Sequence, residues 1–228
     1  QHIDDTTEIV AITQVSNVLG SITDLSSIIQ KAKIHNARVV VDGCQALAHL
    51  PVDLHEMGAD FYVFSGHKVY GPTGIGVLYG QYDILQNMPP LRTGGAMISE
   101  VTHNSFTPAP IPERFEPGTL PIAEIIGLGE AMRWISESYP LISQQEKDLI
   151  YLTLEEYHKR PWLSLLGTEK EHNRIGCFSF HIEDVHPHDI TYLLAQKNIA
   201  VRGGHHCAQP LMNVYNIPGS TRLSTGMY

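Results

Sequence analysis

Two reactive side chains stand in segments of distinctive composition. Cys207 ends the segment RGGHHC, residues 202–207, and Lys68 ends the segment SGHK, residues 65–68. A lysine amine forms a Schiff base with a carbonyl compound, and a cysteine thiolate is a strong nucleophile. An enzyme that makes a Schiff base with one group and moves sulfur with the other needs both nucleophiles.

The residues near Lys68 meet the needs of a pyridoxal phosphate site. Such a site takes a lysine amine, a carboxylate for the pyridinium nitrogen and donors for the phosphate. Asp42 ends an apolar run and can keep the ring nitrogen protonated, and Gln45 can reach the ring hydroxyl. Ser65 and His67 flank the lysine and can donate to phosphate oxygens. Lys68 is therefore the candidate Schiff-base amine.

Arg222 meets the last need, an anchor that holds the substrate carboxylate with two parallel hydrogen bonds. Taken singly, each of these residues has an ordinary explanation: an aspartate after a strand often caps a helix, and a lysine there is usually solvated. Ser65 and His67 also suit a simple turn. The combination of a strand, DGCQ at residues 42–45, a second strand and SGHK at residues 65–68 strongly favours the cofactor site.

Cys207 also has competing explanations. A free cysteine is often a core residue, but this one follows polar residues and lies near Arg202, whose charge favours the thiolate. A metal site of His205, His206 and Cys207 is weakly supported, because consecutive side chains of an extended segment point in opposite directions and no second ligand pair has zinc spacing. A Cys/His hydrolase is also weakly supported, since no oxyanion-binding motif is visible.

Composition limits the other possibilities. The chain has 228 residues, 43% of them hydrophobic, and a net charge of -9, which fits one large or two modest globular domains and argues against general nucleic-acid binding. No apolar run is long enough to span a membrane. Three widely spaced cysteines predict free thiols in a reducing, cytoplasmic compartment. Cys44 and Cys177 stand in apolar surroundings and are predicted to be small core residues.

The first half of the chain predicts an α/β sheet. A helix is expected to begin at Thr23 or Asp24, and a helical turn at residues 53–57. Alternation of strands with helices is typical of such sheets, in which ligands gather at the carboxyl ends of the strands. Asp42 and residues 65–68 occupy such ends. The expected strands are residues 9–12, 38–41, 60–64 and 74–79.

The second half predicts a long loop and a smaller α+β unit. Residues 88–121 are rich in Pro, Gly and Thr and read as an irregular functional loop. Pro140 is expected to end a helix. We therefore expect a large domain at residues 1–138 and a small domain at residues 139–228. The expected elements are helices at residues 122–138, 143–158 and 188–196, and strands at residues 175–181 and 199–202.

Three motifs resemble those of the SufS-type (group II) cysteine desulfurases, fold-type I enzymes of the class V aminotransferase group. They are DGCQA at residues 42–46, FSGHKVYGPTGIG at residues 64–76 and RGGHHCAQPL at residues 202–211. The resemblance covers essentially the whole chain, and the lysine and cysteine motifs are highly specific. It implies a partial large domain with a mixed sheet flanked by helices, and a smaller, partial α+β C-terminal domain.

The resemblance also implies an activity. Enzymes of this family use pyridoxal 5'-phosphate to convert L-cysteine to L-alanine, and their persulfide passes to a SufE- or SufU-like acceptor for iron–sulfur cluster assembly. The residue roles that it implies are Lys68 for the Schiff base, Asp42 and Gln45 for the ring, Ser65 and His67 for the phosphate, Asn17 and Arg222 for the substrate carboxylate, Arg202 beside the substrate, Cys207 for the sulfur, and Thr119 for the phosphate of the partner subunit in a homodimer.

The chain departs from the family pattern in two ways. Leu120 precedes Pro121 where the family often has proline directly after the Gly-Thr pair. Family members also carry an N-terminal segment with a phosphate-binding turn and a ring-stacking histidine, and a final helix, so we expect this chain to be a fragment that lacks them. Two alternatives remain at this level: a selenocysteine lyase on the same site, and an inactive truncated chain that acts only in dimerisation or partner binding.

Overall fold

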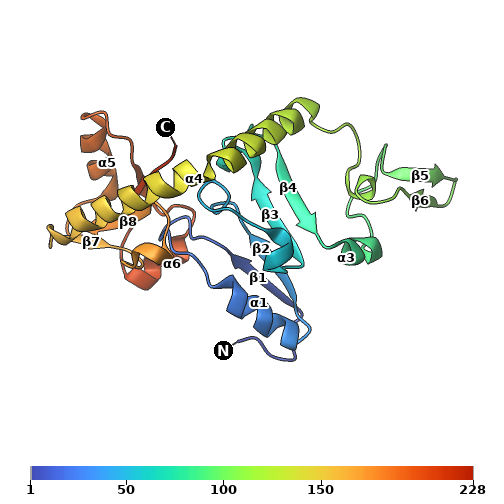
Figure 1. The fold of residues 1–228 in the computed structure, drawn as a ribbon, viewed down its shortest axis with the longest axis horizontal. Helices are drawn as coiled ribbons and strands as arrows, with labels where there is room; N and C mark the ends of the chain where they lie inside the picture. Colours follow the sequence, from blue (N-terminus) through green and yellow to red (C-terminus); the bar gives the residue numbers. More distant parts are fainter. Residues whose placement is uncertain (1, 228) are drawn as a thin grey trace.

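Runs of β-branched and aromatic residues build the first sheet in this computed structural model, which describes residues 2–227. The sheet has the strand order β1 (Ile9–Thr13), β2 (Arg38–Asp42), β3 (Phe61–Ser65) and β4 (Gly76–Gly80). β1, β2 and β3 are parallel, whereas β4 is antiparallel to β3. The mixed sheet predicted from the sequence is confirmed, and three carboxyl strand ends meet at one edge (Figure 1).

Two capped helices follow strands of this sheet. The Asp24 carboxylate accepts a hydrogen bond from the Ser27 amide at 3.3 Å, so α1 (Leu25–Ile34) begins at the expected position. Asp53 caps α2 (Leu54–Met57) in the same way. The buried side chains of α1 recur with helical spacing and pack on the sheet core, which contains Leu25, Ile29, Ala32, Val39, Val41 and Tyr62.

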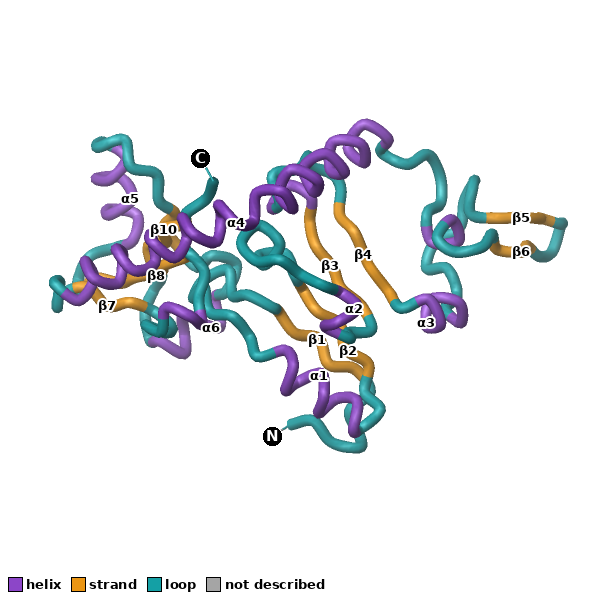
Figure 2. Tube along the Cα trace, in the orientation of Figure 1, coloured by secondary structure: helices purple, strands orange, loops and turns teal. Residues whose placement is uncertain are grey.

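Residues 88–121 are less irregular than the sequence predicts. A short helix, α3 (Tyr82–Asn87), precedes them, and they contain a hairpin of β5 (Ile98–Val101) and β6 (Phe106–Pro108) and a 3-10 turn at Glu113–Phe115. Figure 2 shows this hairpin extending away from the main sheet. Its strands have four and three residues, too few for a hydrophobic period to be read, and the Thr102 and Ser105 side chains stabilise the turn by local hydrogen bonds.

Pro140 does not end a helix. One helix, α4 (Ile122–His158), runs through it. A proline inside a helix removes one backbone hydrogen bond, but tertiary contacts hold both flanks here: Ile135 and Ile142 are buried against Ala48, and the Tyr139 hydroxyl donates to the Leu47 carbonyl at 2.7 Å. The separate helices expected at residues 122–138 and 143–158 are therefore a single element, and the expected domain division after residue 138 falls inside it.

The second sheet has the order β7 (Leu163–Leu165), β8 (Cys177–Ile182), β10 (Ser220–Ser224) and β9 (Arg202–Gly204), and every pair is antiparallel. β8 confirms an expected strand. The strand expected at residues 199–202 is misplaced: β9 covers residues 202–204 and shares only Arg202 with it, because pairing to β10 selects these residues instead.

Helices complete this second unit. α5 (Pro187–Ala195) confirms the helix expected at residues 188–196, while α6 (Gln209–Tyr215) and β10 were not predicted. A 3-10 turn, Glu171–Asn173, precedes β8. In Figure 1, α4 spans from the first sheet to the second. Within residues 2–227, no helix combines the length and apolarity needed to cross a bilayer.

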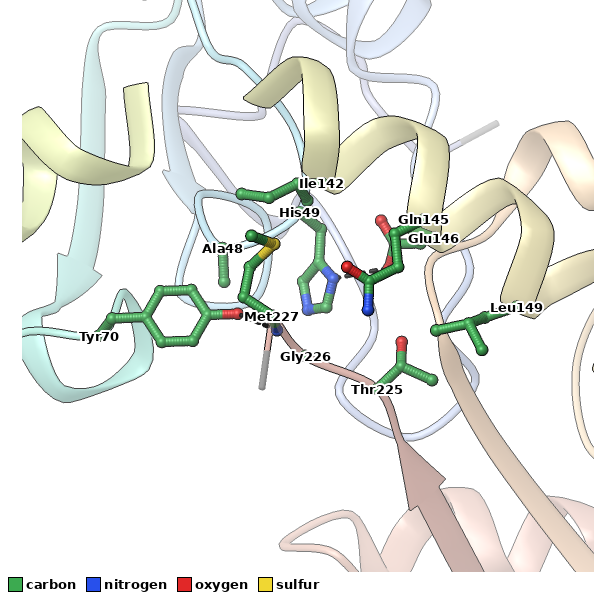
Figure 3. Close-up of a pocket in the computed structure, with 10 residues that line it drawn as sticks. All are labelled: Ala48, His49, Tyr70, Ile142, Gln145, Glu146, Leu149, Thr225, Gly226 and Met227. Atoms are coloured by element: carbon green, nitrogen blue, oxygen red, sulfur yellow. Dashed lines mark hydrogen bonds and ion pairs between the residues drawn. The ribbon is translucent and has the colours of Figure 1, made fainter. Parts of the chain in front are cut away.

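A shared hydrogen-bond acceptor, the Glu146 carboxylate, joins the two units. The Glu146 carboxylate of α4 lies 2.7 Å from the His49 ring and also accepts the Gly176 amide proton at 2.7 Å. Thr225 in turn donates its amide proton to the Gly176 carbonyl at 2.8 Å. Figure 3 shows Glu146 and His49 at a small pocket where α4, the loop after β2 and the segment after β10 converge. The loop that follows Asp42 is thereby attached to the second sheet.

Candidate active site

The carboxyl ends of β2 and β3 bring together the residues predicted to bind a cofactor. Asp42 ends β2, and its carboxylate accepts the Cys44 amide proton at 2.9 Å. Ser65 ends β3, the neighbouring strand, and leads into the 3-10 turn Gly66–Lys68. Lys68 thus follows the carboxyl end of β3, and β3 pairs with β2, which Asp42 ends. The two residues therefore lie at the same edge of the sheet.

Several polar groups at this edge have no protein partner. His67 and Lys68 are exposed, Gln45 is half-buried, and none of the three side chains makes a hydrogen bond or ion pair within residues 2–227. Together with the Asp42 carboxylate and the Ser65 hydroxyl, each of which has a contact to Cys44, the Gln45 amide, the His67 imidazole and the Lys68 amine can meet a ligand of mixed charge. This donor set suits a phosphorylated aromatic aldehyde.

Cys44 lies in this site, and its expected place in the core is wrong. It is only half-buried, and its Sγ lies 3.9 Å from the Ser65 Oγ. Burial raises the pKa of the Cys44 thiol, and the hydrogen bond and charge of Asp42 raise it further, so the thiol stays protonated. Its position two residues beyond the strand-end Asp42 is the sequence signal from which its place in the site could have been predicted. Cys177, by contrast, is confirmed as a buried residue.

Gly43 is required by a close approach. A β-carbon at this position would lie 1.9 Å from the Tyr62 hydroxyl oxygen. The Tyr62 ring is fully buried, and its hydroxyl donates to Gln14 Oε1 at 2.6 Å. The turn that presents Asp42 therefore passes directly over a fixed tyrosine.

Cys207 lies on a tight turn between β9 and α6. Both His206 and Cys207 adopt the left-handed conformation, with φ of 54° and 60°, which places the Cys207 side chain in an exposed position. The turn is closed by the Ala208 amide, which donates to the His205 carbonyl at 2.9 Å. The thiol is accessible, as a group that attacks a small substrate must be.

His206 is buried beneath this turn. Its side chain is 2% exposed, and Nε2 lies 3.0 Å from the Ser220 carbonyl oxygen, so this nitrogen carries the proton and donates. Burial lowers the pKa of His206 to about 4, and the nearby Arg222 charge adds to the effect. His206 is therefore neutral near pH 7. No group of three or more His, Cys, Asp or Glu side chains in the described part of the chain could hold a metal ion.

Asn17 joins the two halves of the site. It follows β1, and its amide donates to the His206 carbonyl at 2.7 Å. Its own carbonyl accepts from Arg222 Nη1 at 2.8 Å. Arg202 lies opposite Arg222 in the pairing of β9 with β10. The structure thus brings Asn17, Arg202 and Arg222 to the Cys207 turn.

Sequence comparison places this geometry in a family. A model of class-V aminotransferases matches residues 1–228. The chain belongs to the class-V aminotransferase family. A cysteine desulfurase of Yersinia pestis (strain Pestoides F) is 45% identical over 99% of this chain and 55% of its own length.

Solved structures of this class-V aminotransferase family share the fold. The cysteine desulfurase CsdA (S-sulfonic acid) from Escherichia coli superposes with a TM-score of 0.89 at 38% identity, covering 98% of this chain and 55% of that one. A C-DES variant with glycine covalently linked to its pyridoxal phosphate cofactor gives 0.79 at 25% identity, over 99% and 57%. The fold-type I α/β architecture is confirmed, and the chain spans about half the length of the relatives it matches.

Thr119 makes no hydrogen bond or ion pair with the other predicted site residues within the part of this class-V aminotransferase chain that the structure describes. It is exposed on the segment before α4, and no hydrogen bond or ion pair within residues 2–227 connects it to Lys68 or Cys207. The role predicted for Thr119 is to bind the phosphate in the site of a partner subunit, and one chain does not test it. This role therefore stays a prediction.

Proposed function

We propose that this chain is part of a SufS-type cysteine desulfurase, which converts L-cysteine to L-alanine and holds the sulfur as a persulfide on Cys207. One observation carries the proposal: Asn17, in the turn that follows β1 of the sheet whose neighbouring strands lead to Asp42 and Lys68, is hydrogen-bonded to both the Cys207 turn and Arg222. A Schiff-base amine, a carboxylate anchor and an exposed thiol then serve one small substrate.

Pyridoxal phosphate is the cofactor that the residues fit. Lys68 would hold its aldehyde carbon, Asp42 its pyridine nitrogen and Gln45 its ring oxygen. Ser65 and His67 would donate to its phosphate, and the raised pKa of Cys44 leaves an S–H donor beside Ser65. When bound, this cofactor supplies an electron sink for the bonds of the substrate α-carbon.

Arg222 and Asn17 would bind the substrate carboxylate. Arg222 Nη1 contacts Asn17, but its buried Nε has no hydrogen-bond partner within residues 2–227. A buried donor without a partner costs free energy, so a carboxylate at this position would be stabilising. Arg202, on the adjacent strand, adds a second positive charge beside the substrate.

Cys207 would take the sulfur and Lys68 would move the protons. The Cys207 thiolate attacks the substrate sulfur, an S–S bond forms, and the substrate Cβ–S bond breaks. The electron pair stays on carbon and is protonated, which yields alanine. The sulfur is oxidised as the carbon is reduced, so the step needs no external oxidant. Because His206 is neutral near pH 7, the positive charge on this side of the site comes from Arg202 and Arg222.

The wider assembly follows the same family pattern. We propose a large domain at residues 1–138, a small domain at residues 139–228, and a homodimer in which Thr119 reaches the partner subunit's phosphate. The persulfide would pass to a SufE- or SufU-like acceptor for iron–sulfur cluster assembly in the cytoplasm. The net charge of -9 and the three free cysteines are compatible with this setting.

Alanine formation and sulfur mapping test the proposed function. The protein, extended to the length of its relatives and loaded with pyridoxal phosphate, is incubated with L-cysteine, and alanine is measured by chromatography. Alkylation followed by peptide mass spectrometry should place one additional sulfur on Cys207. Absence of alanine, or additional sulfur on Cys44 or Cys177 alone, would refute the proposal.

A further inference from the structure

The turn that carries Cys207 is under local strain. His206 and Cys207 both lie in the left-handed region, with φ of 54° and 60°. Such a conformation is unfavourable for a non-glycine residue and persists only where surrounding contacts enforce it. Two in succession on an exposed turn therefore require anchors outside the turn.

Both anchors act on His206 rather than on Cys207. Its side chain donates from Nε2 to the Ser220 carbonyl at 3.0 Å and lies 3.1 Å from the Ser220 hydroxyl. Its main-chain oxygen accepts from Asn17 Nδ2 at 2.7 Å. The residue before the thiol is thus held at its side chain by β10 and at its backbone by the segment after β1.

These contacts close a ring. Asn17 accepts from Arg222 through its own carbonyl at 2.8 Å, and Arg222 follows Ser220 by two positions on β10. Residues two apart on a strand point to the same face. His206, Asn17, Arg222 and Ser220 therefore form a continuous path that returns to the Cys207 turn, and each link is a hydrogen bond or a strand of fixed geometry.

We propose that His206 is a positioning residue that sets the place of the Cys207 thiol relative to Arg222, through the ring formed with Asn17 and Ser220. The inference rests on the proposed function. In that function the hydrogen-bonded ring holds the Cys207 thiol and the Arg222 carboxylate anchor at the separation that one amino-acid substrate requires. His206 touches neither the substrate nor the cofactor in this role. A fixed near-attack geometry is worth a large part of a reaction barrier.

A matched pair of variants tests the role of the donor. Glutamine and methionine have similar lengths, but only glutamine can donate to the Ser220 carbonyl. In the full-length protein loaded with pyridoxal phosphate, His206→Met should lower kcat for alanine formation about tenfold or more, a barrier change of about 1.4 kcal/mol, with KM little changed. His206→Gln should stay within roughly threefold of the unaltered protein.

A readout independent of turnover separates this inference from the proposed function. The rate at which iodoacetamide alkylates Cys207, followed by peptide mass spectrometry, should change at least about threefold in His206→Met and little in His206→Gln, since a released turn samples new thiol positions. This result supports the positioning role even if no alanine is formed. Equal alkylation rates and equal kcat in a folded His206→Met protein would overturn it.

Hydrogen exchange of the unaltered protein covers the case in which His206→Met fails to fold. The peptide that spans residues 205–208 should exchange far more slowly than the exposed hairpin turn at residues 102–105, although His205 and Cys207 are exposed as well. Exchange of residues 205–208 as fast as that hairpin turn would show that the ring does not hold the Cys207 turn, and the inference would be wrong.

Discussion

The Asn17 amide nitrogen lies 2.7 Å from the His206 carbonyl oxygen, although 189 positions of sequence separate the two residues. Asn17 lies in the turn that follows β1, and His206 directly precedes Cys207. The same asparagine accepts a hydrogen bond from Arg222. The Asn17 side chain therefore connects the segment that leaves the first sheet to the turn that presents the Cys207 thiol. Several predictions of function depend on this connection.

Lys68 should be the only lysine that forms the cofactor Schiff base. In the full-length protein with pyridoxal phosphate, borohydride reduction should fix the cofactor to Lys68, and Lys68→Ala should abolish the imine absorbance, because no other amine is expected at the edge formed by β2 and β3. Peptide mapping after reduction measures this. A reduced adduct on Lys33, which lies in α1, would contradict the assignment.

Cys207→Ser should abolish persulfide formation and leave cofactor binding unchanged. The hydroxyl of serine is a much weaker nucleophile than a thiolate, and the exposed Cys207 is not one of the residues predicted to bind the cofactor. Thiol-trapping mass spectrometry and the cofactor absorbance spectrum measure the two effects. Cys177→Ser serves as the control, because that thiol is buried. An equal persulfide yield in Cys207→Ser would show that another cysteine carries the sulfur.

Local sequence signals were sufficient for much of the first sheet. The β-branched run before Asp42 and the capping residues Asp24 and Asp53 act over a few residues, so strands and helix starts could be read directly. Pro140 was misread for the opposite reason: contacts of Ile135, Ile142 and Tyr139 with the loop after β2 override a local helix-breaking signal. Such contacts are not visible in a linear pattern.

The sequence indicated which residue types form the candidate site, but it did not indicate the hydrogen bonds that connect them. The DGCQ and SGHK segments identified Asp42 and Lys68 because each follows its own strand. The buried role of His206 was missed, since an HHC run gives no sign of which histidine turns inward. β10 was missed as well: its residues, STRLS, lack the apolar alternation of a typical strand and depend on pairing with β8 and β9.

Stability should fall on acidification, in part because of His206. The folded-state pKa of His206 is about 4 against an ordinary value of 6.5. The unfolded state therefore binds the proton first, and stability is lost as pH falls from about 6.5 toward about 4. The loss between pH 7 and pH 5 should be roughly 2 kcal/mol. His206→Gln should remove this component. Urea unfolding at both pH values measures it, and identical pH dependence in the two proteins would contradict the prediction.

Glu146→Leu should destabilise the link between the two sheets. It leaves the buried Gly176 N–H and the His49 ring without their shared acceptor, each 2.7 Å from Glu146 Oε1. A buried donor left without its acceptor costs about 1–3 kcal/mol. Glu146→Gln keeps one acceptor oxygen and should lose less. Urea unfolding ranks the three proteins, and a Leu variant as stable as the unaltered protein would show that the shared acceptor contributes nothing.

Gly43→Ala should disturb the Asp42 turn through its contact with Tyr62. The added β-carbon would lie 1.9 Å from the tyrosine oxygen, and the ring cannot retreat because it is buried and bonded to Gln14. We expect a loss of about 1–3 kcal/mol in stability and weaker pyridoxal phosphate binding, since the Asp42 carboxylate moves with the turn.

A double-mutant cycle isolates that contact. Tyr62→Leu alone should cost about 2–4 kcal/mol, because it leaves a cavity in the core of the first sheet. In the Tyr62→Leu background, however, Gly43→Ala meets no ring and should cost at least about 1 kcal/mol less than in the unaltered protein. Urea unfolding gives the four stabilities, and cofactor titration of the full-length protein gives the matching affinities. If Gly43→Ala costs the same in both backgrounds, the tyrosine is not what requires glycine beside Asp42.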